Sequence, residues 1–230
     1  MCSSDLVVTV KRGVNDDEIG DIVKHALEWK CVRGITFQPV QDAGRNENFD
    51  PNRDRTMLSD IRRRVIEDSG VFGAADMIPL PCNPESISIG YGLRNGTSVT
   101  PVTSLIPREE LLAIAPNAIT FEKNLALKDK FVDLFSLSSG ALNTSERMAE
   151  LRCCLPKIRA PEGIGYADVF RIVIVQFMDK YNFCVGGVKR SCIHFVTPAG
   201  QIIPFDTYNM FYRDGGIDKI RARMRMEVEA

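Results

Sequence analysis

Cysteine is the residue type in this sequence best suited to metal chemistry. The sequence has seven cysteines, and several of them stand in proline-bounded or turn-like settings. Thiolates are soft ligands that suit iron–sulfur clusters, and in a chain without a secretory signal several cysteines serve metal or catalysis more often than disulfides. Free cysteine also packs as a small hydrophobic residue, so the residues alone leave both alternatives open.

One of these thiols, Cys192, precedes a strand-like segment. In a strand, Cys192 and His194 would share one face and Ile193 the other, because successive side chains alternate. The segments CIHFVT and QIIPFD, joined by PAG, predict a hairpin here. The shared face is suited either to a metal or to a buried thiol beside a hydrogen-bonded histidine.

Composition limits the remaining possibilities. The 230 residues are 44% hydrophobic and 26% charged with a net charge of −1, enough to bury one large core or two small ones. A charge near zero gives no basis for nucleic-acid binding. No apolar run approaches the ~20 residues of a membrane span, and no secretory signal is present. We therefore expect a cytoplasmic protein.

The first forty residues predict a βαβ unit. VVTVKRG and VRGITFQPV have the β-branched composition of strands. Asn15, with Glu18 three residues later, is typical of a capping box at a helix start. The helix then repeats apolar residues at helical spacing: Ile19, Ile22, Val23, Ala26 and Leu27. Residues 7–10 and 34–39 should therefore pair directly and in parallel through a right-handed crossover.

Polar side chains follow both predicted strands. Lys11 and Arg12 come after the first strand, and Gln38 and Gln41 mark the end of the second. In βα repeats the functional residues gather at these strand ends. The simpler alternative is that they are ordinary loop residues.

The rest of the chain predicts a mixture of helices and hairpins. We expect a helix around 57–65 capped by Gly70, a hairpin around Asn95-Gly96, and a helix opening at Pro107. Further helices are expected over 121–137 and from 145 toward Pro156. The apolar run YADVFRIVIVQFMDKYNF predicts a buried helix.

Several of these segments resemble radical S-adenosylmethionine enzymes. VKRGVNDDEIGDIVKHALE followed by VRGITFQPV is similar to later βα units of their barrel, and RGVNDDEI is close to the branch containing the molybdenum-cofactor cyclising enzyme. PLPCNPE, CCLPKI and KRSCIHFVTPAGQIIPFDTYNMFYRDG resemble the C-terminal half of the group that includes tetraether lipid synthase and related radical methylases. The family's CxxxCxxC motif is absent, so we expect a C-terminal fragment. Residues 1–6, MCSSDL, match a translated sequencing adapter and are expected to be a non-native leader.

The resemblance implies an α/β fold in two parts. Residues 7–105 would form later βα units of a partial (β/α) barrel. Residues 106–230 would form an α+β domain of helices and a hairpin that holds an auxiliary cluster.

The resemblance also implies the ligands of two cofactors. An auxiliary [4Fe–4S] cluster would take about four thiolates from Cys82, Cys153, Cys154, Cys184 and Cys192, with His194 as a weaker substitute. S-adenosyl-L-methionine would contact Arg12, Asn15 and Gln38, although a helix-capping role alone would explain Asn15. Glu85, Ser86 and Asp206 stand where the lipid synthase branch has further cysteines, which favours either the methylase side or a simpler set of metal sites. Tyr208 and Asn209 would face the substrate or pack in an aromatic cluster.

The implied activity is radical chemistry at unactivated carbon. A 5′-deoxyadenosyl radical would abstract hydrogen before methylation or carbon–carbon bond formation, with an external electron donor and a small-molecule or lipid substrate. The catalytic residues stay unassigned. The alternatives are a non-catalytic metal-binding or electron-transfer module, and an α/β protein whose cysteines only pack.

Overall fold

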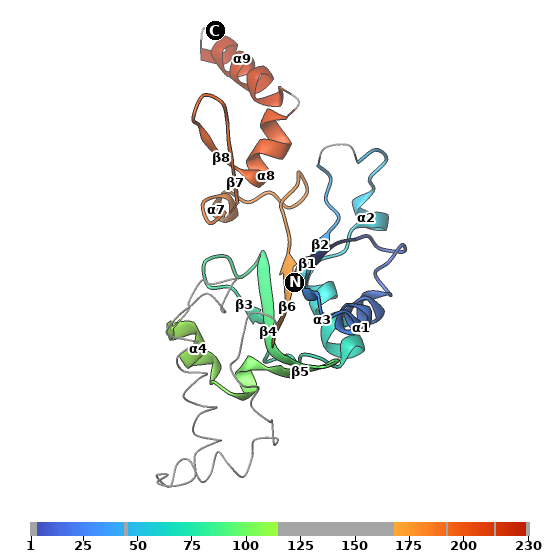
Figure 1. Ribbon diagram of the computed structural model, residues 1–230. Helices are drawn as coiled ribbons and strands as arrows, with labels where there is room; N and C mark the ends of the chain where they lie inside the picture. The colour runs from blue at the N-terminus through green and yellow to red at the C-terminus, as the bar shows by residue number, and fades with distance from the viewer. Residues whose placement is uncertain (1–3, 44–45, 115–167, 192, 214, 229–230) are drawn as a thin grey trace, which may run out of the picture.

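The computed structural model describes residues 4–43, 46–114, 168–191, 193–213 and 215–228. Within them a mixed six-stranded sheet has the order β1-β2-β6-β4-β3, with β5 paired to β4 (Figure 1). The strands are β1 Ser4–Val10, β2 Val32–Pro39, β3 Ile78–Pro79, β4 Ile87–Asn95, β5 Ser98–Pro101 and β6 Val169–Val175. β1, β2 and β6 run parallel, whereas β4 runs antiparallel to β6, β3 and β5.

The βαβ unit is confirmed. β1 and β2 pair directly and in parallel, with Val7 opposite Thr36 and Val10 opposite Pro39. Helix α1, Ile19–Glu28, connects them and buries most of the predicted apolar stripe. The predicted cap is wrong. The N-cap position is Glu18, which makes no side-chain capping bond, and the Asn15 side chain binds the preceding turn instead.

Helix α3, Leu58–Ser69, packs beside α1 on one face of the sheet. It ends at Gly70 with φ +66°, which confirms the predicted left-handed cap. The two helices approach closely, since a Cβ on Gly20 would lie 2.7 Å from the backbone oxygen of Asp68. The short helix α2, Pro51–Asp54, precedes α3. Its N-cap is Asp50, whose carboxylate accepts from the Asn52 N–H.

The predicted buried helix over residues 166–183 is wrong, because residues 169–175 form the central strand β6. Phe170, Ile172 and Ile174 of β6 join the core under α1 and α3, whereas Val169 and Val173 join the core on the opposite face. Both faces of the strand are buried, so its apolar run shows no alternation and resembles a buried helix. Its β-branched composition was the better indicator.

The predicted hairpin near Asn95-Gly96 is confirmed, with Asn95 opposite Ser98. Gly96, at φ +65°, takes the first of the two loop positions. After the turn η1, Val102–Ser104, helix α4 covers Arg108–Ile114, as expected from Pro107. The helices expected over 121–137 and 145–156 lie outside the described residues.

The C-terminal segment forms a smaller unit at the end where β6 leaves the sheet (Figure 1). It contains α7 Val185–Val188, the two-stranded sheet of β7 His194–Val196 and β8 Ile202–Pro204, α8 Phe205–Thr207, the π-helical turn η4 Tyr208–Tyr212, and α9 Gly216–Val228. The antiparallel pairing of β7 and β8 confirms the second hairpin. No helix in the described part of the chain is long and apolar enough to cross a membrane.

The described residues thus form a mixed α/β fold, as expected. The partial barrel stays a prediction, since β4 enters the sheet antiparallel to the three parallel strands. The sheet also takes β6 from beyond residue 105, and this strand lies between β2 and β4.

Candidate functional site

The parallel strands β1, β2 and β6 have their carboxyl ends on the same side of the sheet. We call this side the carboxyl edge, or simply the edge, and the segments that follow the three strands meet there. These segments are residues 11–18, then 40–43 and 46–57, and finally 176–184. Ligands of open α/β sheets bind outside this edge, because loops from neighbouring strands converge on it.

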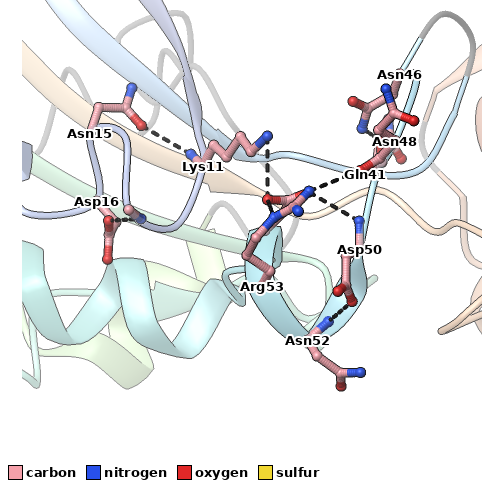
Figure 2. Close-up of polar contacts among 11 residues, drawn as sticks. Lys11, Asn15, Asp16, Gln41, Asn46, Asn48, Asp50, Asn52 and Arg53 are labelled. Carbon is pink, nitrogen blue, oxygen red and sulfur yellow. Dashed lines mark hydrogen bonds and ion pairs between the residues drawn. The ribbon is translucent and has the colours of Figure 1, made fainter.

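A buried carboxylate, Asp54, joins two of these segments. Its side chain is 3% exposed and accepts from Lys11 Nζ at 3.3 Å and from Arg53 Nε at 2.8 Å. Figure 2 shows Lys11 and Arg53 on neighbouring segments. The Asp50 N–H also donates to Asp54 at 3.0 Å. The hydrogen bonds from Arg53 and from the Asp50 N–H hold the pKa of Asp54 well below its ordinary value. Asp54 therefore stays ionised and links the loop after β1 to α2.

A second buried carboxylate, Asp179, joins the segment after β6 to the segment after β2. Its side chain is 1% exposed and pairs with Arg55. The backbone N–H groups of Asp42 and Tyr181 donate to it at 3.0 and 2.9 Å. Burial alone would raise the pKa of Asp179, but the hydrogen bonds from Arg55 and the two N–H groups outweigh it, so the pKa is lowered. Asp179 is thus a second ionised anchor.

Two further bonds connect the segment after β6 to its neighbours. Gln176 Oε1 accepts from the Leu58 N–H at 2.6 Å, which satisfies a backbone donor in the first turn of α3. Asp206 accepts from the Met178 N–H at 2.6 Å and ties the C-terminal unit to the sheet edge. Burial raises the pKa of Asp206, although the hydrogen bond from Met178 acts in the opposite direction.

The residues predicted to contact S-adenosyl-L-methionine lie at or near this edge. Arg12 is exposed, and its Nη1 lies 3.5 Å from the Asn52 carbonyl oxygen. It also lines a polar pocket of about 110 Å³ with Arg63 and Arg64 of α3. Gln38 lies half-buried on β2, opposite Thr9 of β1. Both stay predictions as cofactor ligands.

Asn15 has a structural task instead of the predicted helix cap. Its Oδ1 accepts from the Lys11 N–H at 2.9 Å (Figure 2). Its Nδ2 donates to the Thr9 carbonyl at 3.0 Å. Both ends of the amide therefore bind the turn after β1. A role in cofactor binding stays a prediction.

The described cysteines do not gather into a metal site. Cys82 is half-buried before β4 and packs against the core that includes α4, and Cys184 is exposed just before α7. Cys153, Cys154 and Cys192 lie outside the described residues. Within the described ranges no three His, Cys, Asp or Glu side chains are placed to hold a metal. A cluster held by four of the five candidate thiolates would need at least two of the three undescribed cysteines, so the cluster stays a prediction.

Sequence reasoning missed the anchors Asp54, Asp179 and Arg55. Asp50-Pro51 was a usable signal, because an aspartate before proline commonly begins a helix and would have placed Asp54 at a helix end. Asp179 falls within the segment predicted as a buried helix. In the structure the strand β6 ends at Val175, and QFMD, residues 176–179, follows its carboxyl end.

Beside the anchors lies a cleft of about 460 Å³. Asp42 and Ala43 from the loop after β2, Lys180 and Phe183 from the segment after β6, and Asn209, Met210 and Phe211 of η4 line it. Lys180 Nζ lies 2.6 Å from Asp42 Oδ2. The cleft thus combines aromatic walls, one ion pair and one amide.

No family model matches this sequence. Over 90% of its length the chain is 27% identical to the 7,8-dihydro-6-hydroxymethylpterin dimethyltransferase of Methanocaldococcus jannaschii. The match covers 48% of that protein, so the chain spans about half the length of the curated relative it matches. The chain is therefore similar, over nearly its whole length, to part of a methyltransferase.

Proposed function

We propose that this chain is part of an S-adenosyl-L-methionine-dependent methyltransferase of the radical type. The observation that carries the proposal is the similarity over 90% of the chain to a curated methyltransferase. The segments RGVNDDEI, PLPCNPE and CCLPKI, which resemble radical enzymes of this kind, support the radical assignment. A CxxxCxxC loop would lie in the half of the relative's length that this chain does not match.

The contribution of this chain would be a rigid edge that positions the cofactor and the substrate. The anchors Asp54 and Asp179 hold the three segments after the parallel strands in one arrangement. Such support is what a binding site needs, because small displacements of its side chains weaken binding and catalysis. Arg12 would bind the carboxylate of the cofactor, and Gln38 would lie on its adenine side.

Cys82, Cys153, Cys154, Cys184 and Cys192 would supply the ligands of an auxiliary [4Fe–4S] cluster, fed by an external electron donor. The electron that cleaves the cofactor would come from the CxxxCxxC cluster, whose motif this chain does not contain, and the cleaved cofactor would supply the carbon radical that methylation of unactivated carbon requires. Carbon–carbon bond formation stays the alternative outcome of the same radical chemistry.

The substrate would be a small molecule with a ring system. The relative's name describes a pterin substrate, and the aromatic cleft beside the anchors has the volume of a small-molecule site. We propose a planar heterocycle of this general class for the present chain.

Equilibrium dialysis of the anaerobically purified chain against labelled S-adenosyl-L-methionine tests the proposal. Wild type should bind, and Arg12→Gln should bind about tenfold more weakly, because a charge-assisted hydrogen bond to the carboxylate is lost. The matched control is Arg221→Gln on α9, whose guanidinium pairs with Asp218 and should leave binding unchanged. A folded wild-type chain without affinity for the cofactor would refute the proposal.

A further inference from the structure

We propose that the cleft lined by Asp42, Lys180, Phe183, Asn209 and Phe211 binds a planar nitrogen heterocycle with an amino group next to a ring nitrogen. The inference rests on the proposed function and names the chemistry that this part of the site recognises. The volume of the cleft, about 460 Å³, lies within the ~300–1,000 Å³ of small-molecule sites. The cleft lies at the carboxyl ends of the parallel strands, where open α/β sheets bind their ligands.

The amide of Asn209 is the first indication of a ligand. The residue is 7% exposed, and its Oδ1 is buried without a hydrogen-bond partner in the described part of the chain. Buried polar atoms almost always have a partner, so a buried amide without one on the wall of a cleft points to a missing ligand. Asn209 also belongs to the π-helical turn η4, a rare conformation that is frequent at functional sites.

The amide of asparagine presents a donor and an acceptor side by side. It therefore pairs with a ring edge that carries an acceptor nitrogen beside an amino group, as asparagine does with adenine in nucleic acids. Rotation about the last side-chain bond exchanges the amide oxygen and nitrogen, so either order of donor and acceptor fits.

The walls of the cleft suit a flat ring. Phe183 and Phe211 stand edge to face with their ring centroids 5.5 Å apart, and Met210 lies beside them. Phe183 is 40% exposed, so part of its ring is open to a partner. Aromatic side chains stack on nucleobase-like rings with little dependence on which base is present.

The lining of the cleft also includes an ion pair. Asp42 is bound through its backbone N–H to the anchor Asp179, and its carboxylate pairs with Lys180. An amino group on the ligand could donate to this carboxylate. A purely aliphatic ligand would leave both Asp42 and Asn209 without a new partner, so an aliphatic chain is a poor match.

Two sources could provide such a ring, namely the substrate and the adenine of the cofactor. Isothermal titration of the full chain with 6-hydroxymethylpterin and, separately, with adenosine distinguishes them. Binding of the pterin alone assigns the cleft to the substrate, and binding of adenosine alone assigns it to the cofactor. In either case the affinity should fall about tenfold in Asn209→Leu, which removes the amide but keeps the volume.

The matched control is Asn52→Leu, an exposed asparagine of α2 outside the cleft, which should leave the affinity within about twofold. A second variant, Phe211→Leu, keeps an apolar side chain but removes the ring, and should also weaken binding severalfold. Thermal unfolding of each variant shows whether it is folded.

Absence of binding by wild type, or equal affinity in wild type and both cleft variants, would overturn the inference. The proposed function can fail while this inference holds. In that case the chain would bind the heterocycle in an Asn209-dependent way in the titration but would bind no S-adenosyl-L-methionine in dialysis.

Discussion

Few other side chains could replace Asp179. Its carboxylate, on a side chain that is 1% exposed, pairs with Arg55 and accepts hydrogen bonds from two backbone N–H groups. Removal of its charge would leave the guanidinium of Arg55, which is 16% exposed, without its anion. We expect Asp179→Asn to lower the free energy of unfolding by about 3 kcal/mol, as for other buried pairs that lose one partner. Urea denaturation at pH 7 measures it.

The control for Asp179 is Asp21→Asn in α1. Asp21 pairs with Lys24, and both side chains are largely exposed, so the change should cost under about 1 kcal/mol. Equal losses in the two variants would mean that Asp179 is not an anchor. Because the pKa of Asp179 is lowered in the folded protein, the free energy of unfolding depends on pH. The stabilisation by the ionised carboxylate is fully present above the pKa of an unfolded aspartate, near ~3.9, and is lost as the pH falls below that value through the folded pKa.

The contribution of Asp206 to stability should change with pH in the direction opposite to that of Asp179. Burial raises its pKa, so its ionised form is disfavoured in the folded state. A raised pKa makes the relative stability highest at acidic pH and lower as the pH rises through the folded value. Asp206→Asn keeps an acceptor for the Met178 N–H and removes the charge, so it should be at least as stable as wild type at pH 7.

The measurement for Asp206 is the melting temperature of wild type and Asp206→Asn between pH 4 and pH 8. The variant's advantage should shrink toward acidic pH, where wild type is protonated. A variant that melts well below wild type at pH 7 would show that the charge of Asp206 is stabilising.

At the scale of elements, β6 is the strand that joins the two cores. Ile172 is 0% exposed on its helix-covered face. Truncation to alanine should cost ~2–5 kcal/mol, because it leaves a cavity under α1 and α3. Chemical denaturation measures the loss.

The comparison for Ile172 is Ile193→Ala, which precedes β7. Ile193 is 42% exposed, so the same truncation should cost about 1 kcal/mol or less. Similar costs at both positions would contradict the central place of β6 in the core.

Local patterns account for the elements that the sequence predicted. The βαβ unit, the Gly70 cap and both hairpins depend on neighbouring residues, whose periodicity and turn chemistry are visible in the chain. β6 was missed because its partners β2 and β4 lie far away in sequence, and burial on both faces removes the alternation of a strand.

The candidate site was predictable only in its location. Strand ends pointed to Lys11, Arg12 and Gln38, but contacts such as Asp42 with Asp179 join residues 137 positions apart. Asn15 illustrates the same limit, since its spacing to Glu18 fits a cap while its amide binds the turn before it. The cleft around Asn209 required three distant segments to be placed together.

At the scale of the whole molecule, the C-terminal unit and the sheet meet at the proposed site. Two hydrogen bonds hold the segment after β6 in place. The Met178 N–H donates to Asp206 of the C-terminal unit, and Asp179 accepts from the Asp42 N–H of the loop after β2. Over 90% of its length the chain is similar to about half of a methyltransferase.

Iron and sulfide content of the anaerobically purified chain tests the radical assignment most directly. The account predicts about four iron and four sulfide per chain in wild type, their loss in Cys192→Ala, and their retention in Cys31→Ala, whose thiol is exposed and outside the proposed ligand set. A folded wild-type chain without iron, or equal iron in both variants, would contradict it.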